Sequence, residues 1–371
     1  MEARRRVLAT IVEERVSLHA SNKDIINKYL CRRILGTLWI VCGSLASSSC
    51  LCVGKQQLVW PRRPSSLLML HHFGRRSLSL TAGELASVAV VGVGGVGGPV
   101  AAALATAGKA DVTVVARGET RKKLRKAGLV VELTSGGVVE DSVHVRCSSS
   151  STSEHQQPQH QPPTFRVADA REEELSQAVG EQDFVVLCMK QGDQLRDAAK
   201  LAQPLLGPST TVVTLQNGLP FWYFAGCASH EYLPRLQRLQ SADPDGSLSA
   251  MLPPDSILGG AVYISGTRRR GDSSGNGAVV VDNNQHGSNV LVIGDATGAA
   301  AAVAEKGQER EQQQAASQRA RSFRGLFAGG KPVIDVQLVA GPEATRNAVW
   351  DKLVANLSYN CLSGALSVEL S

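Results

Sequence analysis

The sequence lacks any cysteine pattern that would build a cross-linked or metal-bound scaffold. Its eight cysteines are scattered over 371 residues, and Cys50 and Cys52 lie in the N-terminal segment. Neither the framework of a small disulfide-rich domain nor the ligand spacing of a zinc site is present. His155 and His160 have no cysteine or carboxylate at such spacing, so no metal site is expected. These features predict a protein of a reducing compartment.

Acidic residues are absent from Ile25 to Gly83. Three pairs of adjacent arginines occur there among many serines and leucines: Arg32-Arg33, Arg62-Arg63 and Arg75-Arg76. This composition is typical of an organellar transit peptide, so residues 1–85 are predicted to be a targeting or disordered segment, mitochondrial or of another organelle. The uncharged run from Ile34 to Gly54 is long enough for a membrane span, but its serines and cysteines make it a poor one. A signal anchor and a cytoplasmic protein are the alternatives; no stable membrane association is expected of the mature form.

The net charge of +6 is unevenly distributed. Residues 1–83 hold 13 Lys or Arg against 4 Asp or Glu, and the remainder holds 26 against 29. A basic N-terminal segment before a slightly acidic domain does not resemble a nucleic-acid-binding face. We therefore expect a small-molecule ligand and no nucleic acid.

A β-branched run from Ser87 to Val91 breaks into glycines and then into an alanine-rich stretch, which predicts a strand, a tight turn and a helix. The turn satisfies G-x-G-x-x-G, whose backbone can hold a pyrophosphate at the helix N-terminus. Its residues are Gly92, Val93, Gly94, Gly95, Val96 and Gly97. A glycine-rich turn without a ligand is the alternative, but the strand predicted from Asp111 to Ala116 completes a βαβ unit. We therefore expect a Rossmann-type dinucleotide-binding domain.

The residue after the second strand indicates which dinucleotide is bound. NAD-binding folds usually place Asp or Glu there, whereas this chain has Arg117. A carboxylate would repel a 2′-phosphate, and a guanidinium can bind one through two hydrogen bonds. NADP (NADPH) is therefore the expected cofactor. Most of the cations from Arg121 to Lys126 are expected to form the polar face of the next helix.

Two further buried strands are predicted, and polar residues follow each. The strand from Asp183 to Met189 leads to Lys190, and the strand from Thr211 to Leu215 leads to Gln216 and Asn217. Open α/β sheets bind their ligands at the carboxyl ends of parallel strands. Lys190 and Asn217 are thus expected to contact cofactor or substrate. An Asn-Gly turn with a purely structural role is the alternative.

One lysine and two asparagines recur every fourth residue near the end of the chain. Lys352, Asn356 and Asn360 would form a row on a helix that drifts by only ~40° per step. The apolar residues beside this row are expected to form a buried face: Trp350, Leu353, Val354, Leu357 and Cys361. An ammonium and two amides suit a small anionic ligand with a carbonyl group. A solvated helix edge is the alternative.

Together these motifs resemble the ketopantoate reductase family, the NADPH-dependent 2-dehydropantoate 2-reductases of pantothenate and coenzyme A biosynthesis. The resemblance extends from about Val88 to Leu366 and includes Leu215-Gln216-Asn217-Gly218-Leu219-Pro220 and Leu258-Gly259-Gly260. It implies that Lys352 is the general acid and that Asn356 and Asn360 bind the hydroxyl and carboxylate of the substrate. It also implies that Asn217 contacts cofactor and substrate and that Lys190 lies near the nicotinamide ribose.

The same resemblance implies an all-helical second domain whose first helix carries the lysine. Thirty residues follow Gly341, whereas a helical domain needs roughly 100. We therefore expect this domain to be incomplete, or a partner chain to close the cleft; a homodimer is compatible with the resemblance. The family's substrate-binding serine and cofactor-side glutamate have no counterpart that can be assigned, and Cys361 stands where the family commonly has proline.

The predicted fold class is α/β, with a Rossmann-type NADP-binding domain over residues 86–340 and the start of a helical substrate domain over 341–371. Low-complexity insertions are expected near 148–163, 266–277 and 308–324. We expect the first to be a surface loop and the second a hairpin loop between Ala261–Ile264 and Val279–Val281. The third is expected to be a polar helix extension. A β-hydroxyacid dehydrogenase relative with another substrate and a catalytically silent NADPH-binding protein are the alternative functions.

Overall fold

The fold is that of a computed structural model of the 371-residue chain. The structure describes residues 85–148, 163–225 except 172 and 174, 239–269, 278–284, 289–298 and 317–366, with side chains described up to Leu357 in the last range. The chain divides into two compact units, Met1–Leu70 and His71–Ser371, and all described residues lie in the second. The predicted targeting segment lies outside the described residues except for Leu85, as does the predicted loop 148–163 except for its two ends.

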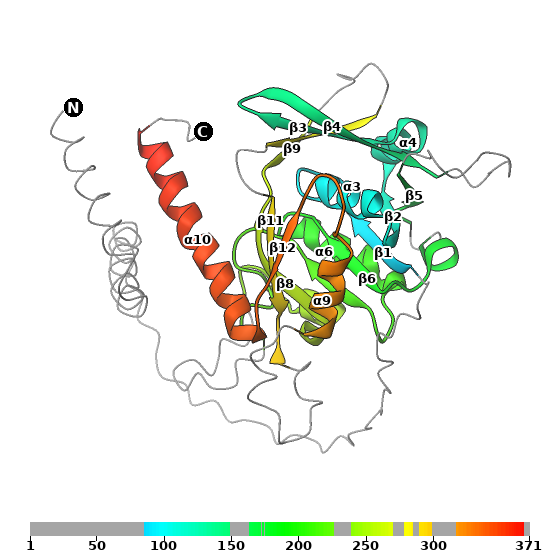
Figure 1. The fold of residues 1–371 in the computed structure, drawn as a ribbon. Helices are drawn as coiled ribbons and strands as arrows, with labels where there is room; N and C mark the ends of the chain where they lie inside the picture. Colours follow the sequence, from blue (N-terminus) through cyan, green and yellow to red (C-terminus); the bar gives the residue numbers. More distant parts are fainter. Residues whose placement is uncertain are drawn as a thin grey trace, which may run out of the picture. The chain divides into compact units, whose positions relative to one another are not determined.

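Twelve strands form one continuous hydrogen-bonded sheet in the described part of the chain (Figure 1). They are β1 (Ala86–Val91), β2 (Ala110–Ala116), β3 (Leu129–Ser135), β4 (Val138–Cys147), β5 (Thr164–Asp169), β6 (Phe184–Leu187), β7 (Thr211–Thr214), β8 (Ile257–Tyr263), β9 (Gly266–Arg268), β10 (Val279–Asn284), β11 (Val290–Asp295) and β12 (Asp335–Leu338). The α-helices are α3 (Gly97–Ala107), α4 (Gly118–Ala127), α6 (Asp193–Ala202), α7 (Ser247–Met251), α9 (Gln318–Gly325) and α10 (Gly341–Leu366). Short helical turns cover Leu175–Val179, Gln203–Leu205 and Pro254–Ser256.

The centre of the sheet has the strand order of a Rossmann fold. Neighbouring strands are parallel along β5-β2-β1-β6-β7-β8. Numbered along the chain, this order is 3-2-1-4-5-6, the arrangement that binds dinucleotides at the carboxyl ends of its strands. All four residues of β6 and all four of β7 are buried, as expected for parallel strands covered on both faces. The predicted α/β Rossmann-type fold is confirmed.

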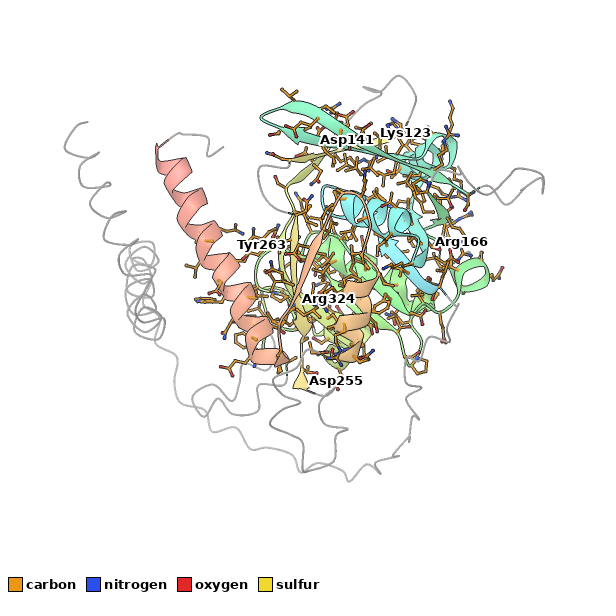
Figure 2. The ribbon with its side chains drawn as sticks, viewed as in Figure 1. Lys123, Asp141, Arg166, Asp255, Tyr263 and Arg324 are labelled. Carbon is orange, nitrogen blue, oxygen red and sulfur yellow. The ribbon has the colours of Figure 1, made fainter. Side chains whose placement is uncertain are left out.

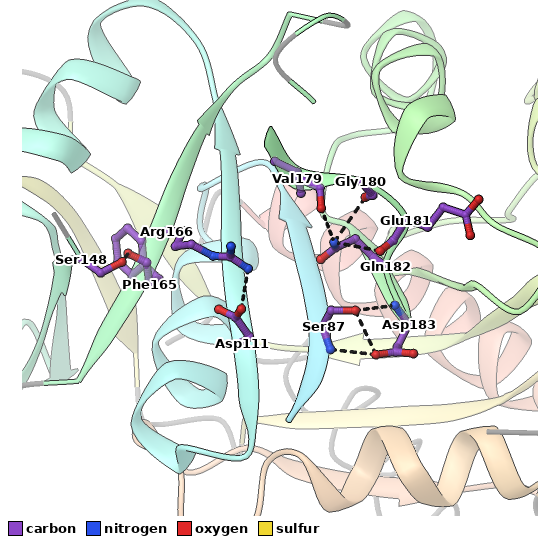
Figure 3. Close-up of polar contacts among 10 residues, drawn as sticks. All are labelled: Ser87, Asp111, Ser148, Phe165, Arg166, Val179, Gly180, Glu181, Gln182 and Asp183. Carbon is purple, nitrogen blue, oxygen red and sulfur yellow. Dashed lines mark hydrogen bonds and ion pairs between the residues drawn. The ribbon is translucent and has the colours of Figure 1, made fainter. Parts of the chain in front are cut away.

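Polar contacts at the amino ends of the central strands set their register (Figure 3). The Asp183 carboxylate accepts hydrogen bonds from the Ser87 amide at 2.8 Å and from the Ser87 hydroxyl at 2.9 Å, which ties β6 to β1. Arg166 forms an ion pair with Asp111 and joins β5 to β2 in the same way. Because these contacts lie at the amino ends, the carboxyl ends are left available for ligands.

Beyond β5 the sheet continues through β4, β3 and β10 to β9 and passes over the far side of α3. Figure 1 shows β3, β4 and β9 on one side of α3 and the central strands on the other. Every residue of α3 from Gly97 to Ala105 is buried, and a Cβ at Gly98 would lie 2.8 Å from a methyl of Val281 in β10. A helix enclosed in this way requires small residues, which its glycines and alanines provide. Gly108 ends the helix in the left-handed conformation at φ 64°.

The structure corrects the predicted hairpin. Ala261–Ile264 was expected to be its first arm, but residues up to Tyr263 belong to β8, between β7 and β11. The strand that pairs with β10 is β9, in antiparallel register with Arg268 opposite Val281. The sequence interpretation did not separate β8 from β9, because only two residues lie between them and the sequence reads as one extended segment.

A helix is confirmed at the described end of the predicted polar helix extension 308–324, but the prediction that it is only a polar extension is wrong. Helix α9 buries Ala320 and Phe323, and the Phe323 ring packs against Phe184 with centroids 5.5 Å apart. Arg319 forms an ion pair with the Asp295 carboxylate at 2.6 Å. The polar composition of this segment gave no sign that Phe323 packs into the core. Because Phe323 is buried there, α9 is part of the domain.

Helix α10 confirms that the Lys352 row lies on one helix, but the expected buried face does not form over its described part. Thr345 and Val349 are buried, whereas Trp350 is 36% exposed and Leu357 is 48% exposed. The helix packs against β11 and β8, with Thr345 close to Gly294 of β11 and Lys352 over the Tyr263 ring of β8. Periodicity identifies an apolar stripe but not what covers it. Among the described helices, none is both long and apolar enough to cross a membrane.

The close approach of the chain to α3 makes a testable prediction about Gly330. A Cβ at Gly330 would overlap the carbonyl oxygen of Ala103 in α3, whereas a Cβ at Gly325 meets nothing within 4 Å. Gly330→Ala is expected to lower the free energy of unfolding by about 1–3 kcal/mol because the backbone must move. Gly325→Ala is the matched control and should change it by less than about 1 kcal/mol. Urea titration of both variants measures the difference; equal stabilities would contradict the packing described for α3.

Candidate active site at the carboxyl edge of the sheet

The six parallel strands all end at one edge, where the chain places the residues singled out in the sequence. The glycine loop follows β1, Arg117 follows β2, and Lys190 and Asn217 lie just beyond β6 and β7. Helix α10 adds Lys352 to this edge beside Tyr263, the last residue of β8. Residues from five separate segments are therefore brought together by the parallel topology.

The glycines of the loop after β1 have different roles. Gly92 has φ 96°, and a Cβ there would collide with the sulfur of Met189. A Cβ at Gly97 would overlap the carbonyl oxygen of Gly92, so both glycines allow α3 to start directly against the strand end. Gly94 instead has nothing within 4 Å of its would-be Cβ. Its open face is where a ligand can approach the backbone.

The other residues of the loop expose backbone groups rather than side chains to a ligand. Val93 is buried and Val96 is partly buried against the core, so neither side chain reaches outward. Gly95 lies in backbone contact with Gly266 of β9. No side chain caps the N-terminus of α3. Its first amides and the helix dipole therefore suit the pyrophosphate of a dinucleotide, and the loop fits that group.

Arg117 is exposed at the N-cap position of α4, and its guanidinium forms no ion pair with any residue that the structure describes. On the neighbouring strand, Asp169 at the end of β5 is in register with Ala116. Its carboxylate forms ion pairs with Arg121 at 2.9 Å and Arg171 at 2.8 Å, which offset its charge. Arg121 is thus engaged by Asp169, as expected for a cation of the helix face, while Arg117 is left to face solvent.

Hydrogen bonds tie the ends of β6 and β7 together. The Gln191 side chain donates to the Asn217 carbonyl at 2.8 Å, and the buried Gln216 side chain donates to the Leu187 carbonyl at 2.8 Å. The side chains of Lys190 and Asn217 remain exposed at the edge. The backbone of the Asn-Gly turn is thus held in place beside the segment that carries Lys190.

Lys352 is half-buried, with its ammonium 4.0 Å from the centroid of the Tyr263 ring. Tyr263 is labelled in Figure 2 and lies on the part of β8 that packs against α10. Burial lowers the pKa of Lys352. Burial, and then the Asp351 carboxylate, raise the pKa of Tyr263, so the phenol remains neutral beside the ammonium. The ring face attracts the cation and holds it at the end of β8.

Of the two asparagines in the row, the structure describes the side chain of Asn356 but not that of Asn360. Asn356 follows Lys352 by one helical turn and is partly exposed. Asn360 lies in the same helix, but its side chain lies outside the described residues. The structure thus brings Lys352 to the edge that carries the glycine loop, Lys190 and Asn217, and places Asn356 next to it along α10.

Two cations that the sequence interpretation did not assign to the site line a cavity beside the glycine loop. The cavity has a volume of about 660 Å³, and Lys123, Lys190 and Arg268 are among its lining residues, with Gly95. Lys123 belongs to the predicted polar helix face and Arg268 to the predicted hairpin loop. The local sequence does not distinguish these two cations from solvent-exposed ones. They reach the cavity because the order of strands in the sheet brings β9 next to the glycine loop.

No group of three or more His, Cys, Asp or Glu residues suited to a metal ion occurs within the described ranges. The glycine backbone and the cationic side chains of the site instead suit a dinucleotide.

Comparisons with known proteins find similarity to one enzyme family. Residues 88–220 match the family model "Ketopantoate reductase PanE/ApbA". A 2-dehydropantoate 2-reductase of Mesorhizobium japonicum is 35% identical over 176 residues, which cover 47% of this chain and 44% of that protein. The crystal structure of a candidate ketopantoate reductase from Ralstonia solanacearum superposes with a TM-score of 0.53 at 26% identity, covering 77% of this chain and 69% of that one.

These findings confirm the resemblance inferred from the motifs: residues 88–220 are similar to ketopantoate reductases. The match spans less than half the length of the curated relative.

The open face of Gly94 makes a prediction about binding. Gly94→Ala should leave thermal stability unchanged, because the added methyl meets no protein atom within 4 Å. It should weaken dinucleotide binding by about tenfold or more if the pyrophosphate rests against this backbone. Isothermal titration with NADPH, alongside thermal denaturation, separates the two effects. Undiminished affinity in a folded Gly94→Ala protein would place the pyrophosphate elsewhere.

Proposed function

We propose that this protein uses NADPH to reduce 2-dehydropantoate to pantoate, a step of pantothenate and coenzyme A biosynthesis. The observation that carries the proposal is the position of Lys352. It lies against the end of β8, at the same edge as the glycine loop and the Asn217 turn, both of which lie in the residues that match the ketopantoate reductase family model. A half-buried ammonium at this edge can donate a proton to the carbonyl oxygen of a small keto acid during its reduction.

The residues that would hold the cofactor come from four strand ends. The backbone of Gly92 to Gly97 would bind the pyrophosphate, Arg117 the adenosine ribose phosphate, and Lys190 and Asn217 the nicotinamide half. NADPH supplies the hydride for the carbonyl carbon. The exposed guanidinium of Arg117, with no carboxylate left uncompensated nearby, supports NADPH over NADH.

Lys352 would donate a proton to the carbonyl oxygen as negative charge develops on it. Burial lowers its pKa, so the ammonium gives up its proton more readily than an exposed lysine does. Asn217, Asn356 and Asn360 would orient the substrate through amide hydrogen bonds to its hydroxyl and carboxylate. The partly exposed position of Asn356, one turn beyond Lys352, is compatible with this role.

Replacement of Lys352 tests the proton-donor role. Lys352→Ala is expected to reduce turnover of 2-dehydropantoate by about 10²–10⁴-fold while NADPH affinity changes little. Stopped-flow NADPH oxidation and a separate binding titration measure the two quantities. Lys109→Ala is the control, because Lys109 is an exposed lysine in the turn between α3 and β2, at the opposite edge. Full turnover by Lys352→Ala would exclude Lys352 as the proton donor.

The pH dependence provides a second readout of the same assignment. The protonated lysine is the active form, so kcat/KM should be constant at low pH and fall as pH rises through the Lys352 pKa. Because that pKa is lowered, the midpoint should lie below the ordinary lysine value of about 10.4. The residual activity of Lys352→Ala should lack this alkaline decline. An unchanged decline in that variant would assign the titration to another group.

Reversal of charge at Arg117 tests the cofactor assignment. The unmodified protein should bind NADPH more tightly than NADH, and Arg117→Asp should lose about 1.5–3 kcal/mol of NADPH binding because a charged hydrogen-bond donor is replaced by a repelling carboxylate. Arg117→Gln should give an intermediate loss. The ratio of the two dissociation constants, measured by fluorescence titration, is the readout. Equal affinities in the unmodified protein would refute NADPH specificity.

A further inference from the structure

The basic cavity beside the glycine loop contains more positive charge than the proposed cofactor residues account for. Lys123 comes from α4, Lys190 follows β6, and Thr267, Arg268 and Arg269 come from β9 and the residue after it. The remaining lining residues are glycines and the apolar start of β10, so no carboxylate belongs to the described lining. Such a cavity favours an anionic group.

The register of β9 directs Arg268 toward the glycine loop. Alternate residues of a strand share a face, so Arg268 lies on the same face as Gly266. A Cβ at Gly266 would overlap the carbonyl oxygen of Gly95 in the loop. Arg268 also lies opposite Val281, whose methyl groups face Gly98 at the start of α3. Both contacts place Arg268 on the face that looks onto the loop and the helix N-terminus.

A hydrogen bond fixes the far end of the Arg268 side chain. Its guanidinium donates to the Thr120 hydroxyl at 3.0 Å, in the first turn of α4. Thr120 is three residues from Arg117, the residue at the end of β2, and three residues from Lys123 on the same helix face. The Arg268 guanidinium is therefore held within one helical turn of Arg117 and Lys123.

The neighbouring Arg269 has a different role. Its guanidinium forms ion pairs with Asp282 and Glu132 at 2.7 Å, which link β10 to β3. Its charge is thus used inside the sheet, and that of Arg268 is not matched by a carboxylate among the described residues. The two adjacent arginines divide into one that joins strands and one that faces the cavity.

We propose that Arg268 is a second ligand, besides Arg117, of the phosphomonoester on the adenosine ribose of NADPH. This inference rests on the proposed function. In a Rossmann fold the adenosine ribose lies at the end of the second strand, which is where α4 begins and where Arg268 is tethered. A dianionic phosphate has oxygens for more than one guanidinium, and hydrogen bonds between charged partners are the strong ones.

The test compares binding of ligands with and without the 2′-phosphate. Arg268→Gln should raise the dissociation constant of NADPH about 10- to 100-fold and leave that of NADH within about twofold. Arg268→Lys, which keeps the charge but not the planar fork, should fall between. Titration with 2′,5′-ADP and 5′-ADP gives the same comparison without the nicotinamide half and without turnover.

Two controls make the result specific. Arg324→Gln removes one positive charge from the exposed surface of α9 and should leave both affinities unchanged (Figure 2). Circular dichroism and thermal denaturation confirm that each variant is folded. If Arg268→Gln does not fold, the 2′,5′-ADP and 5′-ADP affinities of Arg268→Lys are used instead: reduced selectivity for 2′,5′-ADP supports the proposal, and unchanged selectivity overturns it.

The outcomes separate this inference from the proposed reaction. A loss confined to the phosphate-bearing ligands supports the role of Arg268 even if 2-dehydropantoate is not turned over, a result that would refute only the reaction. Equal losses for NADPH and NADH, or no loss for either, would overturn the role of Arg268 even in an active reductase. Equal affinity of the unmodified protein for 2′,5′-ADP and 5′-ADP would overturn it as well.

Discussion

The enclosure of α3 is the constraint on which the rest of the described structure depends. The helix meets backbone or side chains on three sides: at Gly97 the end of β1, at Gly98 the strand β10, and at Ala103 the turn that contains Gly330. Each approach is close enough that an added methyl would collide. Since burial of α3 joins the central sheet to the strands that pass over it, the small side chains of α3 set the spacing of both layers.

The same enclosure organises the candidate site. Strand β9 is the last strand of the part of the sheet that passes over α3, and it contacts Gly95 near the N-terminus of the helix. The glycine loop is therefore covered on one side by β9, while its open face remains at Gly94. Anion-binding amides, the cations of α4 and the cations of β9 thus converge because of packing around a single helix. Lys352 is held on a separate support, the Tyr263 ring at the end of β8.

The predictions that the structure confirmed depend on short segments. The strand, turn and helix around Gly92 follow from β-branched residues, glycines and alanines in succession, and Gly108 ends the helix as its lack of a Cβ allows. Arg117, Lys190 and Asn217 could be placed at strand ends because buried parallel strands read as continuous apolar runs. The predictions that failed concern burial. Phe323 is buried despite its polar neighbours, and Trp350 and Leu357 are partly exposed despite their helical spacing.

By itself the sequence determined the central strands, the turn that approaches a dinucleotide and the helix that carries Lys352. These features depend on residues a few positions apart, where propensity and periodicity act. Only the tertiary structure decided that β9 rather than β8 pairs with β10, that Arg268 faces the glycine loop while Arg269 joins strands, and that Lys352 rests on Tyr263. Each of these relations joins segments far apart in the chain, and the physical reason is that strand register and packing around α3, not local sequence, set which face of a strand looks inward.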